Sequence, residues 1–124
     1  MKLTEETPRI VRDLMTDNLV AVLPADRVAR ARDLLLTIGI HALPVMDNNG
    51  VHGIVTSTDL SDDWDGDEEI SRVMTPVPTT ISDEASIGEA AELMIAHRIH
   101  HLLVTDDREV IGILSSFDLL DALT

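Results

Sequence analysis

Apolar residues recur along the chain at two spacings, and these spacings predict the order of the elements. An amphipathic helix is indicated where apolar positions lie three or four residues apart, and Gly39 directly after them favours its end. The apolar positions of this helix are Val28, Ala31, Leu34, Leu35 and Ile38. Two apolar runs, 43–46 and 51–55, flank an Asn-Gly turn typical of a hairpin, since these residues accept positive φ. An extended segment at 19–22 and a short helix from about Ser57 complete a β-α-β-β-α unit.

The same unit occurs twice. Shifting the chain by 59 residues lays Val11–Leu60 over Ile70–Leu119 without a gap, with fifteen of fifty positions identical. The second copy has an extended segment at 78–81, apolar runs at 102–104 and 110–114, and a short helix from about Ser116. Its first helix carries Ile87, Ala90, Ala91 and Met94 and begins with a capping-box pattern of Ser86 and Glu89. We therefore predict a mixed α/β (α+β) fold, with repeat 1 at 8–62 and repeat 2 at 70–122.

An acidic segment joins the repeats. Six of the nine residues at 61–69 are acidic, so we expect residues 63–69 to form a solvated linker that does not pack. A calcium loop is the alternative, but Gly66 stands fourth from Asp63, whereas the EF-hand pattern places its glycine sixth. Trp64, within this segment, is expected either to cover an edge of the fold or to contact a partner.

The composition of the chain limits the classes of partner that it is expected to bind. Nine basic residues stand against 23 acidic ones, a net charge of −14, which disfavours nucleic acid and anionic membrane surfaces. Aspartate is abundant and Lys2 is the only lysine, as in halophilic proteins, although an acidic mesophile fits too. The lack of cysteine excludes thiolate chemistry and disulfides. Without a signal-like N-terminus or an apolar run of about 18 residues, we expect a soluble cytoplasmic protein with no membrane partner.

The residues just after each hairpin carry the candidate chemistry. Asp59 and Asp118 could accept hydrogen bonds from the two hydroxyls of a ribose. The hydroxyls of Thr56 and Ser115, with backbone N–H groups at the helix starts, would suit a phosphate. His41 and His100 are candidate cations beside that phosphate. The alternative is structural: the two aspartates are first-turn acids favoured by the helix dipole, and the hydroxyl residues are ordinary caps.

Other patterns predict packing rather than chemistry. His97, His100 and His101 would share one face only if the helix continued through them, and the repeat ends it near Arg98, so no metal site is expected. Gly53 and Gly112 are expected to allow close backbone approach within the hairpins, and Met15 and Met74 to fill the core. No nucleophile–base pair, paired carboxylates or Gly-rich phosphate loop is present. We therefore expect no catalytic residues, no enzyme activity and no cofactor.

Three motifs, each present twice in the same order, resemble the CBS (cystathionine β-synthase) domain. They are Val11–Thr16, His41–Val45 and Gly53–Leu60 in the first repeat, and Ser71–Pro76, His100–Val104 and Gly112–Leu119 in the second. The resemblance covers roughly residues 8 to 122. It implies a Bateman module, in which two repeats pack with pseudo-two-fold symmetry around two clefts. Such modules commonly form homodimers through their helices and bind AMP, ADP, ATP or S-adenosylmethionine. They regulate an attached or associated protein and are not catalytic.

The same resemblance implies two sets of nucleotide-binding residues. One cleft would combine His41, Ile54, Thr56, Thr58 and Asp59 with Pro78 and Thr79. The other would combine His100, Ile113, Ser115, Phe117 and Asp118 with Leu19 and Val20. Family members that bind polyphosphates often carry Arg or Lys where this chain has His41 and His100, which favours AMP or an uncharged adenosyl ligand.

The function implied is therefore a regulatory sensor of an adenosine compound. That compound would act as a regulatory ligand rather than a cofactor and would signal to an effector protein that the sequence does not identify. A ligand-free scaffold or adaptor dimer is the alternative.

Overall fold

The computed structural model describes residues 10–124, which divide into two compact units. The contiguous unit is Val20–Pro78, and the two-segment unit joins the residues up to Leu19 to Thr79–Thr124. The contiguous unit contains α1 (Val28–Ile38), β1 (Ala42–Asp47), β2 (Gly50–Thr56), α2 (Ser57–Leu60), η2 (Ile70–Arg72) and β3 (Thr75–Pro76). The two-segment unit contains η1 (Val11–Asp13), β4 (Thr80–Ser82), α3 (Ile87–His97), β5 (His101–Asp106), β6 (Glu109–Ser115) and α4 (Ser116–Asp121). Among the described residues, no helix is long and apolar enough to cross a membrane.

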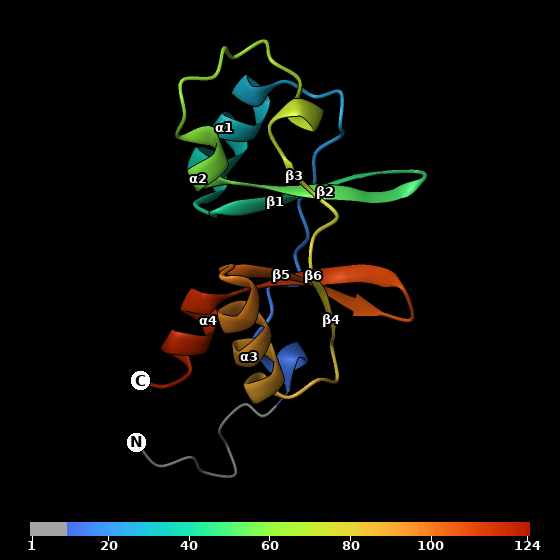
Figure 1. Ribbon diagram of the computed structural model, residues 1–124, viewed down its shortest axis with the longest axis vertical. Coiled ribbons are helices and arrows are strands. Elements are labelled where there is room, and N and C mark those ends of the chain that lie inside the picture. The colour runs from blue at the N-terminus through green and yellow to red at the C-terminus, as the bar shows by residue number, and fades with distance from the viewer. Residues whose placement is uncertain (1–9) are drawn as a thin grey trace. The chain divides into compact units, whose positions relative to one another are not determined.

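The contiguous unit is a three-stranded sheet, ordered β1-β2-β3, with α1 and α2 on one face (Figure 1). Both strand pairs are antiparallel, and Val22 adds a parallel bridge to Val45. The predicted helix is confirmed, since α1 ends at Gly39 in the left-handed conformation with φ 77°. The predicted hairpin is confirmed too, but Gly50 alone takes a positive φ there, and neither residue of the turn at 48–49 does.

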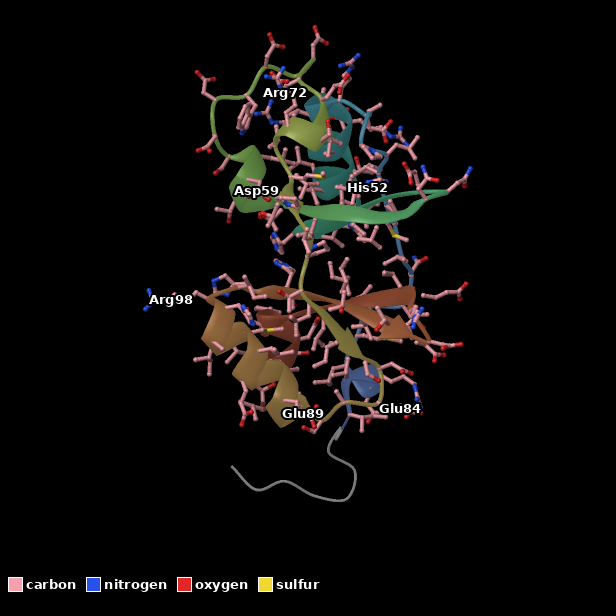
Figure 2. All side chains as sticks on the ribbon, turned by 45° about the vertical axis from the view of Figure 1, so that its right-hand side comes forward. His52, Asp59, Arg72, Glu84, Glu89 and Arg98 are labelled. Atoms are coloured by element: carbon pink, nitrogen blue, oxygen red, sulfur yellow. The ribbon has the colours of Figure 1, made fainter. Side chains whose placement is uncertain are left out.

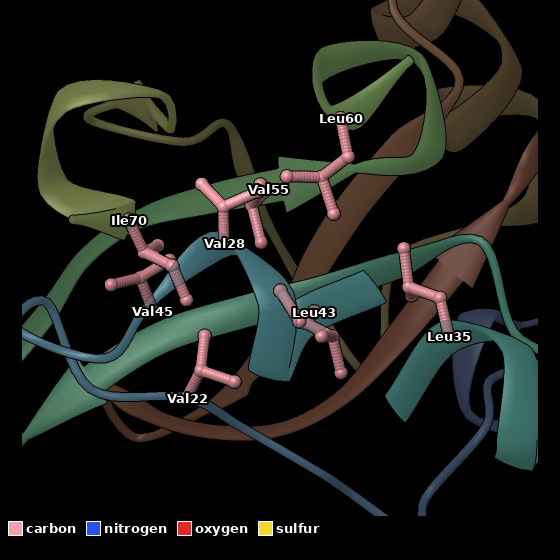
Figure 3. Packing of buried hydrophobic residues seen from close by; sticks show 9 residues of the cluster. Val22, Val28, Leu35, Leu43, Val45, Val55, Leu60 and Ile70 are labelled. Atoms are coloured by element: carbon pink, nitrogen blue, oxygen red, sulfur yellow. The ribbon is translucent and has the colours of Figure 1, made fainter. Parts of the chain in front are cut away.

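The core of this unit comes from both repeats of the sequence. Val28, Ala31 and Leu35 of α1 pack on Leu43, Val45 and Val55 of the sheet, with Val22, Leu60 and Ile70 around them (Figure 3). Ile70 is fully buried although it begins the second repeat. Burying a side chain of this size contributes about 1.5–3 kcal/mol, so the unit depends on a residue from beyond the acidic segment.

The two-segment unit repeats the plan with the other half of the chain. Its sheet has the order β4-β5-β6, with β4 parallel to β5 and β5 antiparallel to β6, and α3 and α4 cover one face (Figure 1). Val11, from the start of the first repeat, is fully buried in its core, and Thr16 bridges to Ile113. Beside Val11, the Nε of Arg12 lies 2.9 Å from Oδ2 of Asp83, the only buried charged residue within 10–124.

The repeats therefore exchange their first segments, and two glycines permit the exchange. A Cβ added to Gly53 would lie 2.5 Å from the carbonyl oxygen of Thr75, and one on Gly112 would lie 2.8 Å from that of Thr16. Both glycines do allow close approach, but the prediction that this occurs within each hairpin is wrong. The approaching backbone is the exchanged segment, held by the sulfur-containing side chains of Met15 and Met74, which pack against the two cores as predicted.

The acidic segment packs against α1, and the prediction of a solvated linker that does not pack is wrong. Glu68 and Gly66 offer their carbonyl oxygens to the N–H groups of Val28 and Ala29, at 2.9 and 3.0 Å. These are first-turn donors that a helix cannot satisfy itself. The indole Nε1 of Trp64 donates to the carbonyl oxygen of Asp59 at 3.1 Å, and its ring packs against the core. Most of the acidic side chains of this segment are exposed. The charge pattern therefore predicts the exposure of the side chains correctly but not the packing of the backbone.

Candidate functional site

The candidate site of the contiguous unit lies where β2 ends and α2 begins (Figure 2). Thr56 is the N-cap of α2, and its Oγ1 accepts a hydrogen bond from the N–H of Asp59 at 3.2 Å. In return Oδ2 of Asp59 accepts from the N–H of Thr56 at 2.9 Å. This is a complete capping box, with aspartate in the position that glutamate usually takes. Asp59 therefore has a structural role, because its carboxylate caps the N-terminus of α2.

The two-segment unit has the same arrangement between β6 and α4. Ser115 Oγ accepts from the N–H of Asp118 at 3.1 Å, and Asp118 Oδ2 accepts from the N–H of Ser115 at 2.8 Å. The Thr-x-x-Asp and Ser-x-x-Asp spacing could have predicted both boxes from the sequence. The box predicted for Ser86 is only half formed, since Ser86 Oγ accepts from the N–H of Glu89 at 3.0 Å without the reciprocal bond.

These boxes occupy two of the backbone N–H groups at each helix start that were expected to suit a phosphate. In the contiguous unit the N–H groups of Thr56 and Asp59 bond within the box, and that of Ser57 donates to the carbonyl oxygen of His41 at 2.8 Å. In the two-segment unit Ser116 donates in the same way to His100 at 2.8 Å. Each aspartate is half-buried and keeps Oδ1 without a hydrogen bond within residues 10–124. That oxygen is the acceptor each junction has to offer a ligand.

The remaining predicted residues surround these junctions within each unit. His41 and His100 are exposed directly before β1 and β5, and Nδ1 of His100 lies 3.2 Å from Oγ of Ser116. Ile54 and Ile113 lie two residues before the N-caps, on β2 and β6. Thr58 and Phe117 are equivalent exposed positions on the short helices.

The other four predicted residues lie where the chain passes between units. Leu19 and Thr79 belong to the two-segment unit, and Val20 and Pro78 belong to the contiguous unit.

The helix that carries His97 ends where the repeat alignment predicts. α3 stops at His97, because Arg98 takes the left-handed conformation with φ 54° and closes the helix. His100 and His101 then belong to the following segment and strand, so the three imidazoles do not share a helix face. Within residues 10–124, no group of three or more His, Cys, Asp or Glu side chains is placed to hold a metal ion.

Comparison with known proteins identifies the family. The CBS domain matches the chain twice, at residues 11–63 and 70–124. The chain is 38% identical over 113 residues to a homoserine O-acetyltransferase of Methanocorpusculum labreanum, covering 89% of this chain and 23% of that protein. It is 30% identical to the uncharacterized protein YlbB of Bacillus subtilis, covering 88% of this chain and 78% of that one. The chain thus spans about a quarter of the length of the enzyme relative.

Solved structures agree with this assignment. A CBS-domain containing protein, ATU1752 from Agrobacterium tumefaciens, superposes with a TM-score of 0.88 at 24% identity over the whole of both chains. CBSX2 in complex with AMP gives 0.79 at 30% identity, covering 94% of this chain and 96% of that one. The CBS domain pair of MJ0100, in complex with 5′-methylthioadenosine and S-adenosyl-L-methionine, gives 0.85 at 26% identity and covers 92% and 94%. Because the family model matches the chain twice, the chain belongs to the CBS domain family as a tandem pair.

Proposed function

We propose that this CBS pair is a regulatory module that binds an adenosine compound at the junctions of β2 with α2 and of β6 with α4. The observation that carries the proposal is the free Oδ1 of Asp59 and of Asp118, each fixed by its capping box at an equivalent place. A carboxylate held in this way can accept hydrogen bonds from a ribose diol without first being ordered. The similar CBS pairs in complex with AMP and with adenosyl sulfur compounds support the same ligand class.

The module would act by binding rather than by chemistry. A ligand that favours one state of the chain shifts the population of that state, and a second protein that distinguishes the states reads the shift. The enzyme names among the relatives belong to proteins of which this chain matches a minor part, as with the 23% of the acetyltransferase. The proposed effector is a protein that distinguishes the ligand-bound state from the ligand-free state.

We also propose that the chain forms a homodimer through its helical faces. Leu36 of α1 and Ile95 of α3 are equivalent positions and are 83% and 77% exposed. Phe117, Leu120 and Leu123 add exposed apolar surface on and after α4. Large exposed apolar side chains gathered on helices favour association. Sedimentation as a monomer at micromolar concentration would contradict this part of the proposal.

Calorimetric titration of AMP, ADP, ATP and S-adenosylmethionine, in molar KCl and at low salt, tests the binding. We expect saturable heat, and affinity at least about ten-fold weaker at the altered junction in Asp59→Ala or Asp118→Ala, because a hydrogen-bonded charge is lost. Ser86→Ala is the matched control, since it removes a helix cap of similar worth far from either junction in the sequence. A folded protein that gives no heat with any of the four compounds would favour the ligand-free scaffold instead.

A further inference from the structure

We infer that Arg32 of α1 and Trp64 of the acidic segment lock α2 in place within the contiguous unit, whereas the equivalent helix α4 has no such lock in its own unit. The junction at Asp59 is then rigid before any ligand arrives, and the junction at Asp118 is the one that can move. Arg32 and Trp64 act as positioning residues. The inference rests on the proposed function only in treating the two aspartates as binding groups.

The C-terminal end of α2 is held by two side chains from outside the helix. α2 has only four residues, so its own hydrogen bonds cannot keep it folded, and its last carbonyl oxygens need other donors. The carbonyl oxygen of Leu60 accepts from Nε and Nη2 of Arg32, at 3.4 and 3.2 Å. The carbonyl oxygen of Asp59 accepts from Nε1 of Trp64 at 3.1 Å. Asp59 is therefore fixed through its backbone as well as through its capping box.

The same guanidinium also ties the acidic segment to α1. Nη1 of Arg32 donates to the carbonyl oxygen of Trp64 at 3.1 Å, and Nη2 donates to that of Asp62 at 3.2 Å. One side chain thus bridges three carbonyl oxygens, including that of Leu60, with donors fixed in one plane. Lysine offers a single point charge and could not reproduce this arrangement. Because the ring of Trp64 packs against the core, α1, α2 and the acidic segment are joined in one network.

α4 lacks both parts of this lock. In the repeat alignment Ala91 stands at the position of Arg32, and Leu123 stands at that of Trp64. Neither side chain can donate a hydrogen bond. The carbonyl oxygens at the end of α4 instead accept from the N–H groups of residues 122–124, at 3.0–3.2 Å. These donors directly follow the helix, so they are lost together when that stretch of chain frays.

Burial adds to the difference between the two helices. Leu60 of α2 is buried in the core of its unit. The equivalent Leu119 is only partly buried, and α4 contains no buried residue. A short helix with few buried contacts opens locally at a low free energy, and the elements that move on binding are drawn from such regions. We therefore expect α4 to open more often than α2, and ligand binding to order α4 more than α2.

Amide hydrogen exchange, followed by NMR on the ligand-free protein, tests the lock. We expect the protection factor of the Asp59 N–H to be at least about ten-fold higher than that of the Asp118 N–H, because opening α2 breaks bonds to a charged donor. Arg32→Ala should remove this advantage and leave the protection of Asp118 unchanged. Arg30→Ala is the matched control, since Arg30 lies on the same helix and its Nε contacts Asp26, at 3.5 Å, instead of α2.

Two conservative variants and one spectroscopic signal separate positioning from packing. Arg32→Lys keeps the charge but cannot bridge three carbonyl oxygens, so it should not restore the native protection of Asp59. Trp64→Phe keeps an aromatic ring and removes the indole N–H, so it should lower the protection of Asp59 while β1 and β2 keep theirs. Trp64 is the only tryptophan, and its emission should shift to the red in Arg32→Ala but not in Arg30→Ala.

The outcomes separate this inference from the proposed function. Unchanged protection of Asp59 in Arg32→Ala overturns the lock, and so does a loss shared by every amide of the contiguous unit, because that is general destabilisation. Equal protection of Asp59 and Asp118 in the native protein overturns the difference between the junctions. No ligand is present in these measurements, so the lock can stand in a protein that binds none of the four compounds. Conversely, the titrations can succeed in a protein that has no lock.

Discussion

The two repeats differ most informatively at single residues that occupy the same backbone position. His52 and Ile111 are each the extra residue where the hairpin register shifts, between Val45 and Met46 and between Val104 and Thr105. Nε2 of His52 lies 2.8 Å from Oδ1 of Asp47, which also accepts from the N–H of Asn49 at 2.8 Å. These two contacts, the imidazole first, lower the pKa of Asp47. Ile111 gives the equivalent carboxylate no such partner.

The lowered pKa of Asp47 predicts a contribution to stability that depends on pH. Because the folded protein binds this proton less tightly than the unfolded chain, the contribution is fully present above the unfolded pKa of about 3.8. It is lost as pH falls through the lower folded pKa. Urea unfolding from about pH 2 to 6 should show Asp47→Asn less stable than the native protein at the upper end, with the difference vanishing at the lower end. Asp106→Asn is the control and should show a smaller difference, and equal differences for the two variants would contradict the assignment.

At the scale of elements, Gly53 determines where β3 can pair with β2, in addition to its place in the hairpin. β3 pairs with β2 through Gly53 opposite Pro76 and Ile54 opposite Thr75. The pairing brings Sδ of Met74 within 2.7 Å of where a Cβ on Gly53 would stand. The close approach therefore fixes which segment can complete the sheet, and it links residues on both sides of the acidic segment.

Gly53→Ala should destabilise the protein by about 1–3 kcal/mol, because the added methyl group meets the Thr75 backbone, which cannot move independently of the sheet. Gly88→Ala is the matched control. Gly88 is the second residue of α3, and the nearest atom outside its own helix backbone lies 3.8 Å from the added carbon, so this substitution should not destabilise the protein. Thermal unfolding of both variants measures the contrast. A Gly53→Ala protein as stable as the native one would mean that the exchanged segment is not held as described.

At the scale of the whole molecule, the sequence predicted what is local and missed what is long-range. The helices and hairpins follow from spacing and from residues such as Gly39, so they could be predicted repeat by repeat. The exchange of Val11–Thr16 and Ile70–Thr75 could not, because similar motifs do not reveal which sheet each one joins. Asp59 and Asp118 were identifiable as candidates, whereas their capping roles were overlooked. The packing of the acidic segment could not be predicted, because a run of charged residues indicates that the side chains face water but does not show which hydrogen bonds the backbone makes.

The exchange makes a last prediction about which piece of the chain can fold alone. Residues 20–78 hold the complete core of the contiguous unit, including the fully buried Ile70, and all three strands of its sheet. Residues 11–69 have the same length and follow the sequence repeat, but they lack Ile70 and β3 and carry Val11, whose partners lie in the two-segment unit. In molar KCl, thermal unfolding followed by circular dichroism should be cooperative for the 20–78 fragment and not for the 11–69 fragment. The amide-proton NMR signals of the 20–78 fragment should likewise be well dispersed, and those of the 11–69 fragment should not. The two fragments share residues 20–69 and differ only in whether they carry residues 70–78 or residues 11–19. Equal cooperativity in both would mean that the sequence repeat, and not the unit with the exchanged segment, is what folds.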